Sequence, residues 1–192
     1  MWAYGGGTLN NTLEVVEGNN AFRGSVPTAK SGYTFVGWYQ DAECTIPAGE
    51  KGTMDATGKL TPKRSELLPA PQTNVFYARF KAVYGNVTIT REATEDESNG
   101  VGTYVYRLTS KDNPAYVVEV TVPAGGSTTV YDLPCGSYTV EQVNSWSWRY
   151  ADGAQTVTVE DSQTKTVTFD GAAVKEKWLT GSSDAVVNRR EA

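Results

Sequence analysis

The stretch SGYTFVGWY at residues 31–39, together with VFYARF at residues 75–80, decides the fold of the first half of this chain. Both runs are rich in aromatic and β-branched residues, which favour strands. The two-residue period of a strand divides the first run between two faces, with Tyr33, Phe35 and Gly37 on one and Thr34, Val36 and Trp38 on the other. We expect a central strand at 33–39 and a closing strand at 75–80.

Elsewhere in the first half, the residues predict short strands at 2–4 and 12–16. Residues 41–74 form a long polar excursion punctuated by Pro and Gly, and a helical piece is expected at about 62–68 because Pro62 suits a first helical turn. By themselves, these patterns predict a few strands and one long excursion.

The two runs resemble the Listeria–Bacteroides repeat, also called the internalin B-repeat. In that family a GYTFxGWY strand and a closing FYAxF strand bracket a short domain of surface proteins. The resemblance covers about residues 1–83 and includes the glycines at 5–7. It implies a small β-grasp-like domain, in which a sheet packs on one helix or helical turn.

The chain divides near residues 82–85, and turn signals then recur every eight to twelve residues, as in a β-sandwich. Seven strands are predicted, at 86–91, 102–109, 116–122, 127–133, 137–143, 155–160 and 165–169. Several alternate between apolar and polar residues, which indicates one dry and one wet face for each sheet. The fold class expected is therefore all-β or β-rich, with domains at 1–83 and 84–192.

The second half resembles the Cna-B-type domains of Gram-positive surface adhesins and pilins. The matching runs are GNVTIT at 85–90, LPCGSYTV at 133–140, VTF at 167–169, WSWRY at 146–150 and KWLTG at 177–181. The resemblance implies a seven-stranded, prealbumin-like sandwich.

Many Cna-B domains form an internal isopeptide bond between a Lys and an Asn, assisted by a buried Glu. The resemblance places Arg91 at the Lys position, Gln142 at the Glu position and Gly171 at the Asn position. Arg stays protonated, Gln cannot relay a proton and Gly has no amide, so we predict that these degenerate positions do not react.

Composition excludes several other function classes. The net charge is −5, no basic cluster suggests nucleic-acid binding, and no segment is apolar enough to insert in a membrane. The chain lacks histidine and shows no catalytic or metal-ligand spacing, so we expect no enzyme activity, no metal and no cofactor. Asp152-Gly153 suits a turn better than a calcium loop. Cys44 and Cys135 are read as small buried hydrophobes, with an interdomain disulfide as the alternative.

These observations favour a non-enzymatic adhesin or stalk fragment of a larger Gram-positive surface protein, extracellular and wall-anchored through segments outside these residues. The partner would be a host or matrix protein or a glycan, and a monomer is expected. The alternative is a carbohydrate-binding module that uses Trp146, Trp148 and Tyr150 as an aromatic platform, although these rings equally suit a cap on the sandwich core.

Overall fold

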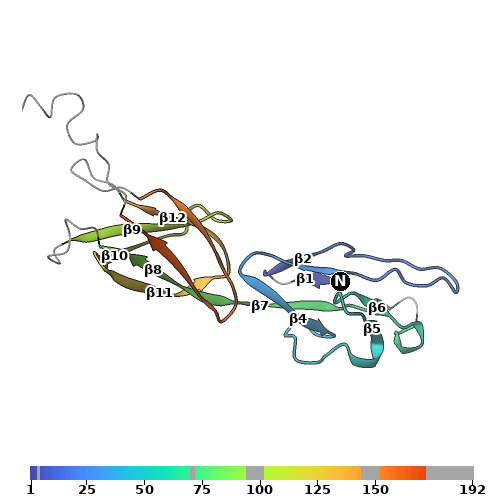
Figure 1. Ribbon diagram of the computed structural model, residues 1–192. Helices are drawn as coiled ribbons and strands as arrows, with labels where there is room; N and C mark the ends of the chain where they lie inside the picture. The colour runs from blue at the N-terminus through green and yellow to red at the C-terminus, as the bar shows by residue number, and fades with distance from the viewer. Residues whose placement is uncertain (4, 70–71, 94–101, 144–151, 172–192) are drawn as a thin grey trace, which may run out of the picture. The chain divides into compact units, whose positions relative to one another are not determined.

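The computed structural model describes residues 1–3, 5–69, 72–93, 102–143 and 152–171. Within these ranges the chain forms strands and two short 3-10 turns (Figure 1). It divides into two compact units, Met1–Val83 and Tyr84–Ala192. The prediction of an all-β fold is confirmed.

Unit 1 contains three small sheets and two 3-10 turns, η1 (Gly49–Lys51) and η2 (Arg64–Glu66). The main sheet has the order β1-β7-β4, with β1 parallel and β4 antiparallel to β7. The η2 turn lies inside the expected helical piece. The strands of the unit are β1 (Trp2–Ala3), β2 (Gly7–Leu9), β3 (Pro27–Ala29), β4 (Tyr33–Tyr39), β5 (Gly52–Met54), β6 (Leu60–Pro62) and β7 (Tyr77–Ala82).

The central strand β4 carries a bulge that the sequence did not reveal. Phe35 pairs with Phe80, but Gly37 pairs with Arg79, so Val36 is an extra residue in the ladder. The bulge reverses the alternation, and the rings of Phe35 and Trp38 meet edge-to-face on the same side of the sheet, with centroids 6.1 Å apart. The predicted division of faces is therefore wrong beyond Val36.

The predicted strand at 12–16 is also wrong, because this segment has no ladder partner. The backbone N–H of Asn10 donates to the carbonyl of Val26 at 3.2 Å, and side chains make further bridges to the returning arm at 20–26. The Glu14 carboxylate accepts hydrogen bonds from the backbone N–H groups of Arg23, at 2.5 Å, and Gly24, at 3.1 Å. Asn10 Oδ1 accepts from the N–H of Val26 at 2.7 Å. Such side-chain bridges hold the arms farther apart than the roughly 4.8 Å of a β-ladder.

Unit 2 is a sandwich of two sheets, with strand orders β10-β9-β12-β13 and β11-β8-β14. Each of the seven predicted strands is present, with ends within two residues of those expected. They are β8 (Tyr84–Arg91), β9 (Thr103–Ser110), β10 (Val117–Pro123), β11 (Gly126–Pro134), β12 (Gly136–Gln142), β13 (Gln155–Val159) and β14 (Thr164–Phe169).

The core of the sandwich follows directly from alternation along these strands. Inward positions of both sheets form one buried cluster that includes Ile89, Tyr106, Val140 and Phe169. Burial of each such apolar side chain contributes about 1.5–3 kcal/mol. Among the described strands of the unit, the first, β8, pairs in parallel with the last, β14. The chain therefore enters this sheet at one end of the ladder and leaves at the other.

Candidate functional site

The inward face of β8 ends in a charge. Val87 and Ile89 are inward and fully buried, and the same alternation places Arg91, the last residue of the strand, in the interior with none of its surface exposed. A guanidinium does not lose its proton in a protein, so its burial requires a nearby anion.

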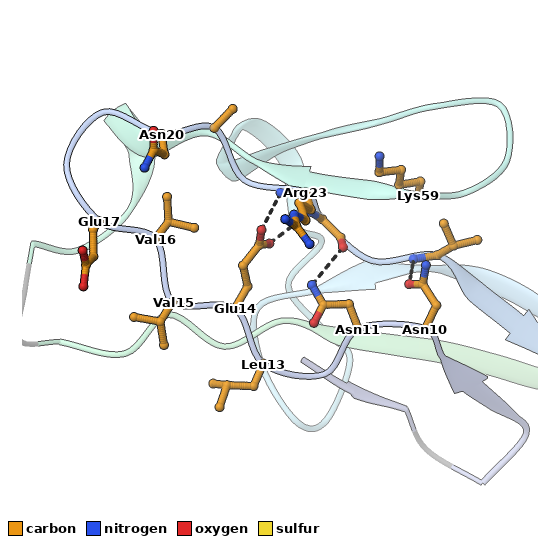
Figure 2. A pocket seen from close by; sticks show the side chains of 13 residues that line it. Asn10, Asn11, Leu13, Glu14, Val15, Val16, Glu17, Asn20, Arg23 and Lys59 are labelled. Atoms are coloured by element: carbon orange, nitrogen blue, oxygen red, sulfur yellow. Dashed lines mark hydrogen bonds between the residues drawn. The ribbon is translucent and has the colours of Figure 1, made fainter.

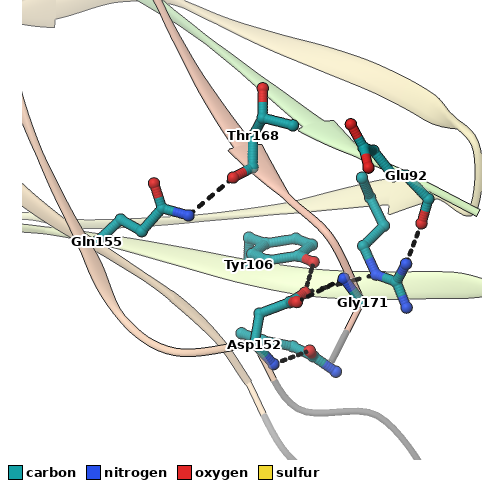
Figure 3. Close-up of polar contacts among 8 residues, drawn as sticks. Glu92, Tyr106, Asp152, Gln155, Thr168 and Gly171 are labelled. Atoms are coloured by element: carbon teal, nitrogen blue, oxygen red, sulfur yellow. Dashed lines mark hydrogen bonds and ion pairs between the residues drawn. The ribbon is translucent and has the colours of Figure 1, made fainter. Parts of the chain in front are cut away.

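Asp152 supplies that anion. Its Oδ2 lies 3.4 Å from Nε of Arg91, and the two side chains are 1% and 0% exposed. Oδ2 also accepts a hydrogen bond from the Tyr106 hydroxyl at 2.5 Å, and Oδ1 accepts one from the backbone N–H of Gly171 at 2.9 Å. Figure 3 shows these contacts converging on the Asp152 carboxylate.

The Arg91 guanidinium also contacts an aromatic ring and a backbone carbonyl. It lies over the ring of Tyr104, 4.4 Å from the centroid, and donates a hydrogen bond to the backbone carbonyl of Glu92. A cation over an aromatic face is attracted by the ring quadrupole, most strongly when water is excluded.

Gln142 and Gly171 complete the cluster. Gln142 Oε1 accepts from the N–H of Asp152 at 3.0 Å, which fixes the backbone that carries the carboxylate. Gly171 has φ +72°, and a side chain there would overlap the guanidinium of Arg91. The structure thus brings together all three residues identified as degenerate isopeptide positions.

The residue at the centre of the cluster, Asp152, was missed. The sequence places it in an Asp-Gly turn, and nothing in that dipeptide indicates burial. The sequence does contain one signal for a buried carboxylate, which is the inward position of Arg91, because a buried guanidinium requires an anion nearby.

The groups of this cluster hold strands together and include no reactive nucleophile. Burial, followed by the hydrogen bond to Asp152, raises the pKa of Tyr106 above its usual range, so the hydroxyl remains a donor. Arg91 offers no free amine as a nucleophile. The network ties the ends of β8, β12 and β14, together with β9, to the segment before β13.

The two cysteines occupy different units, and both are thiols. Cys44 is buried, and Cys135 packs partly buried against the sandwich core. Burial raises the pKa of both thiols, which favours their protonated form. The structure agrees with reading them as small hydrophobes.

An open depression of about 940 Å³ lies in unit 1 between the arms at 10–17 and 20–26 (Figure 2). Two of its polar side chains hold the arms together, since Asn11 donates to the carbonyl of Gly24 and Glu14 accepts from the N–H of Arg23. Within the described ranges, no group of three or more His, Cys, Asp or Glu side chains could hold a metal ion. No helix there has the length and hydropathy that a membrane crossing needs. Trp146, Trp148 and Tyr150 lie outside the described residues.

No protein-family model and no curated protein matches the chain. Among solved structures it is similar to the minor pilin GBS52 of Streptococcus agalactiae, with 18% identity, a TM-score of 0.39, and coverage of 64% of this chain and 67% of that one. It is also similar to the major pilin of Streptococcus pyogenes, with 15% identity, a TM-score of 0.37, and coverage of 78% of this chain and 68% of that one. The Bacillus anthracis TIE protein is 12% identical, with a TM-score of 0.38 and coverage of 88% of this chain and 40% of that one. The chain therefore spans less than half of that solved chain. At this degree of likeness, function has to be argued from the residues of this chain.

Replacing Asp152 by Ala should destabilise unit 2 by about 3–5 kcal/mol, because it leaves a buried guanidinium without its anion. The matched control is Arg107→Gln, which removes half-exposed ion pairs with Glu119 at 2.8 Å and Glu141 at 3.8 Å and should cost less than about 1 kcal/mol. Urea unfolding, followed at resolved amide signals of β8 and β14, measures both. Equal effects of the two substitutions would contradict the buried pair.

Replacing Gly171 by Ala should lower the melting temperature of unit 2. The positive φ alone costs about 1–2 kcal/mol, and the methyl group displaces Arg91 as well. Gly153→Ala is the control, since Gly153 is exposed and has open space around its Cα. A melt of Gly171→Ala that matches that of the control would show that Gly171 does not abut the guanidinium.

Intact-mass measurement should give the full mass of the unreacted sequence. Arg91, Gln142 and Gly171 lack the amine, the proton relay and the amide that a Lys–Asn isopeptide bond needs. A mass lower by one ammonia, with a Lys–Asn cross-link recovered in digests, would contradict this prediction.

Proposed function

We propose that this chain is a non-enzymatic, load-bearing fragment of a larger Gram-positive surface protein, an adhesin or pilus-like stalk. In this role each unit holds a binding region away from the cell, outside the membrane, and the wall anchor belongs to another part of the protein. The resemblance of unit 1 to internalin B-repeats and of unit 2 to Cna-B domains supports this class of protein.

The observation that carries the proposal is the same in both units: the first and last of the described strands are parallel neighbours. In unit 1, β1 pairs with β7, and in unit 2, β8 pairs with β14 over six residue pairs. Tension applied at the two ends of such a pair slides one strand past the other. The ladder hydrogen bonds then carry the load together instead of breaking one at a time.

The cluster around Asp152 lies at the end of the β8–β14 ladder that contains Arg91 and Phe169. Arg91 is the register partner of Phe169, and Gly171 follows two residues later. Tension applied at Gly171 therefore acts on the hydrogen bond from Gly171 to Asp152 and on the ion pair behind it. In this proposal the buried pair reinforces this end of the ladder without a covalent bond.

Single-molecule force spectroscopy tests the proposal. Handles are attached through Tyr84→Cys and Asp170→Cys, in a background with Cys44→Ala and Cys135→Ala, so that β8 and β14 slide past each other. The matched control keeps the Asp170 handle and moves the other to Glu92→Cys, at the same end of the ladder as Phe169. The first geometry should unfold at a clearly higher force, because the control breaks the ladder rung by rung.

Equal unfolding forces in the two geometries, or a lower force in the sliding geometry, would overturn the load-bearing role. Because the handle at residue 170 is common to both geometries, an altered attachment there cannot produce the difference.

A further inference from the structure

Strand β11 contains an irregularity that turns two consecutive side chains outward. Val130 and Leu133 both face the core, at 9% and 1% exposed, and the register shifts between them. A regular strand would bury one of the two residues between these positions. Here both Tyr131 and Asp132 are exposed, so the bulge re-aims this pair toward solvent.

The bulge is held in place from the neighbouring strand. Asp132 has φ +54°, and its N–H donates to Oδ1 of Asn86 at 3.2 Å. The Asn86 amide in turn donates to the Thr164 hydroxyl on β14 at 3.1 Å. Left-handed backbone is uncommon outside glycine, although Asp and Asn tolerate it best. The arrangement therefore fixes the direction of Tyr131 and Asp132.

Tyr131 has the most exposed aromatic side chain in the described residues, at 69%, and a second exposed ring stands on the same face. Tyr84 is 47% exposed and outward by the alternation of β8. It pairs with Pro134, three residues beyond Tyr131, which separates the two rings by about 10 Å along the strands.

The remainder of this outer face is neutral and carries hydroxyl groups. At the outward positions of β8, β11 and β14, all of them described, Asp132 is the only charged residue. The other polar residues there are Asn86, Thr88, Thr90, Ser127, Thr129, Thr164, Thr166 and Thr168. The outer face of the other sheet differs, because Arg107 pairs there with Glu119 and Glu141.

We propose that the outer face of the β11-β8-β14 sheet is a binding site for a neutral glycan, with Tyr131 and Asp132 at its centre. An exposed phenol ring stacks on the apolar C–H face of a pyranose and keeps its hydroxyl in water. The adjacent carboxylate accepts charge-assisted hydrogen bonds from sugar hydroxyl groups. The separation of the two tyrosines is comparable with the length of a disaccharide, so Tyr84 would contact a second sugar.

The charge of the face selects this ligand class. A single carboxylate among hydroxyl groups repels sialylated or sulfated sugars and offers no cation to an acidic peptide. The alternation of threonines presents hydrogen-bonding groups instead of the continuous apolar area of a protein interface. The glycan site lies on the outer face of the sheet that contains the β8–β14 ladder, and it uses different residues from those at 146–150.

The test is a panel of immobilised neutral oligosaccharides, of cell-wall, plant and mucin-core types, with sialylated counterparts, probed with the whole chain. Saturation-transfer NMR on any sugar that binds gives its affinity. Tyr131→Ala should weaken binding at least tenfold, and Tyr131→Phe should weaken it less than threefold because the ring remains. Asp132→Asn keeps a residue that tolerates the backbone and should weaken binding severalfold. Val117→Ala, exposed on the other sheet, is the control and should leave affinity unchanged.

Unchanged melting temperatures of the variants establish that the fold is intact, as the exposure of Tyr131 leads us to expect. The proposal is overturned if no neutral sugar binds, if only sialylated sugars bind, or if Tyr131→Ala binds like Val117→Ala. Binding that survives Tyr131→Ala but is lost on substitution of Trp146 or Trp148 would also overturn it, because the site would then lie at the other aromatic row.

Discussion

The buried ion pair between Arg91 and Asp152 is the constraint on which the organisation of the sandwich depends. A guanidinium placed in the interior by strand alternation requires a carboxylate, and the carboxylate in turn requires donors. Tyr106, Gly171 and the backbone held by Gln142 satisfy those requirements from separate elements. The pair therefore joins both sheets at the end of the β8–β14 ladder that contains Phe169.

A buried pair of this kind specifies geometry more than it adds net stability. Taking both charges out of water costs several kcal/mol for each ion, and their attraction returns this only when the geometry is good. A covalent isopeptide bond would join the strands at this end of the sandwich irreversibly. The noncovalent network fixes it through several directional contacts, which can reform after unfolding.

Regular alternation explains why the sandwich could be predicted from sequence and why other parts could not. The inward series Val87, Ile89 and Arg91 follows from the two-residue period, and the same rule located the strands of unit 2. Bulges at Val36 and at Tyr131–Asp132 each add one residue to a ladder, and no composition signal marks such an insertion. Both bulges determine which aromatic rings are buried and which are exposed.

The prediction of a strand at 12–16 was wrong for a different reason. Its Val and Leu residues favour a strand, but a strand also needs a partner. The N–H groups of Arg23 and Gly24, which a facing strand would donate to backbone carbonyls, donate to the Glu14 carboxylate instead. Asp152 was misplaced because Asp-Gly is common turn chemistry, and its burial depends on an arginine far away in the sequence. Long-range contacts of this kind are not encoded in local patterns.

The most direct test of the central ion pair is native-state hydrogen exchange at the amides of Asp152 and Gly171. Both residues lie outside the strands, yet the structure has each N–H donate to a buried side-chain oxygen. The account predicts exchange as slow as that of the central amides of β8, through opening of the whole unit. Exchange as fast as at the exposed neighbours Gly153 and Ala154 would contradict it, because the cluster would then be open in the native state.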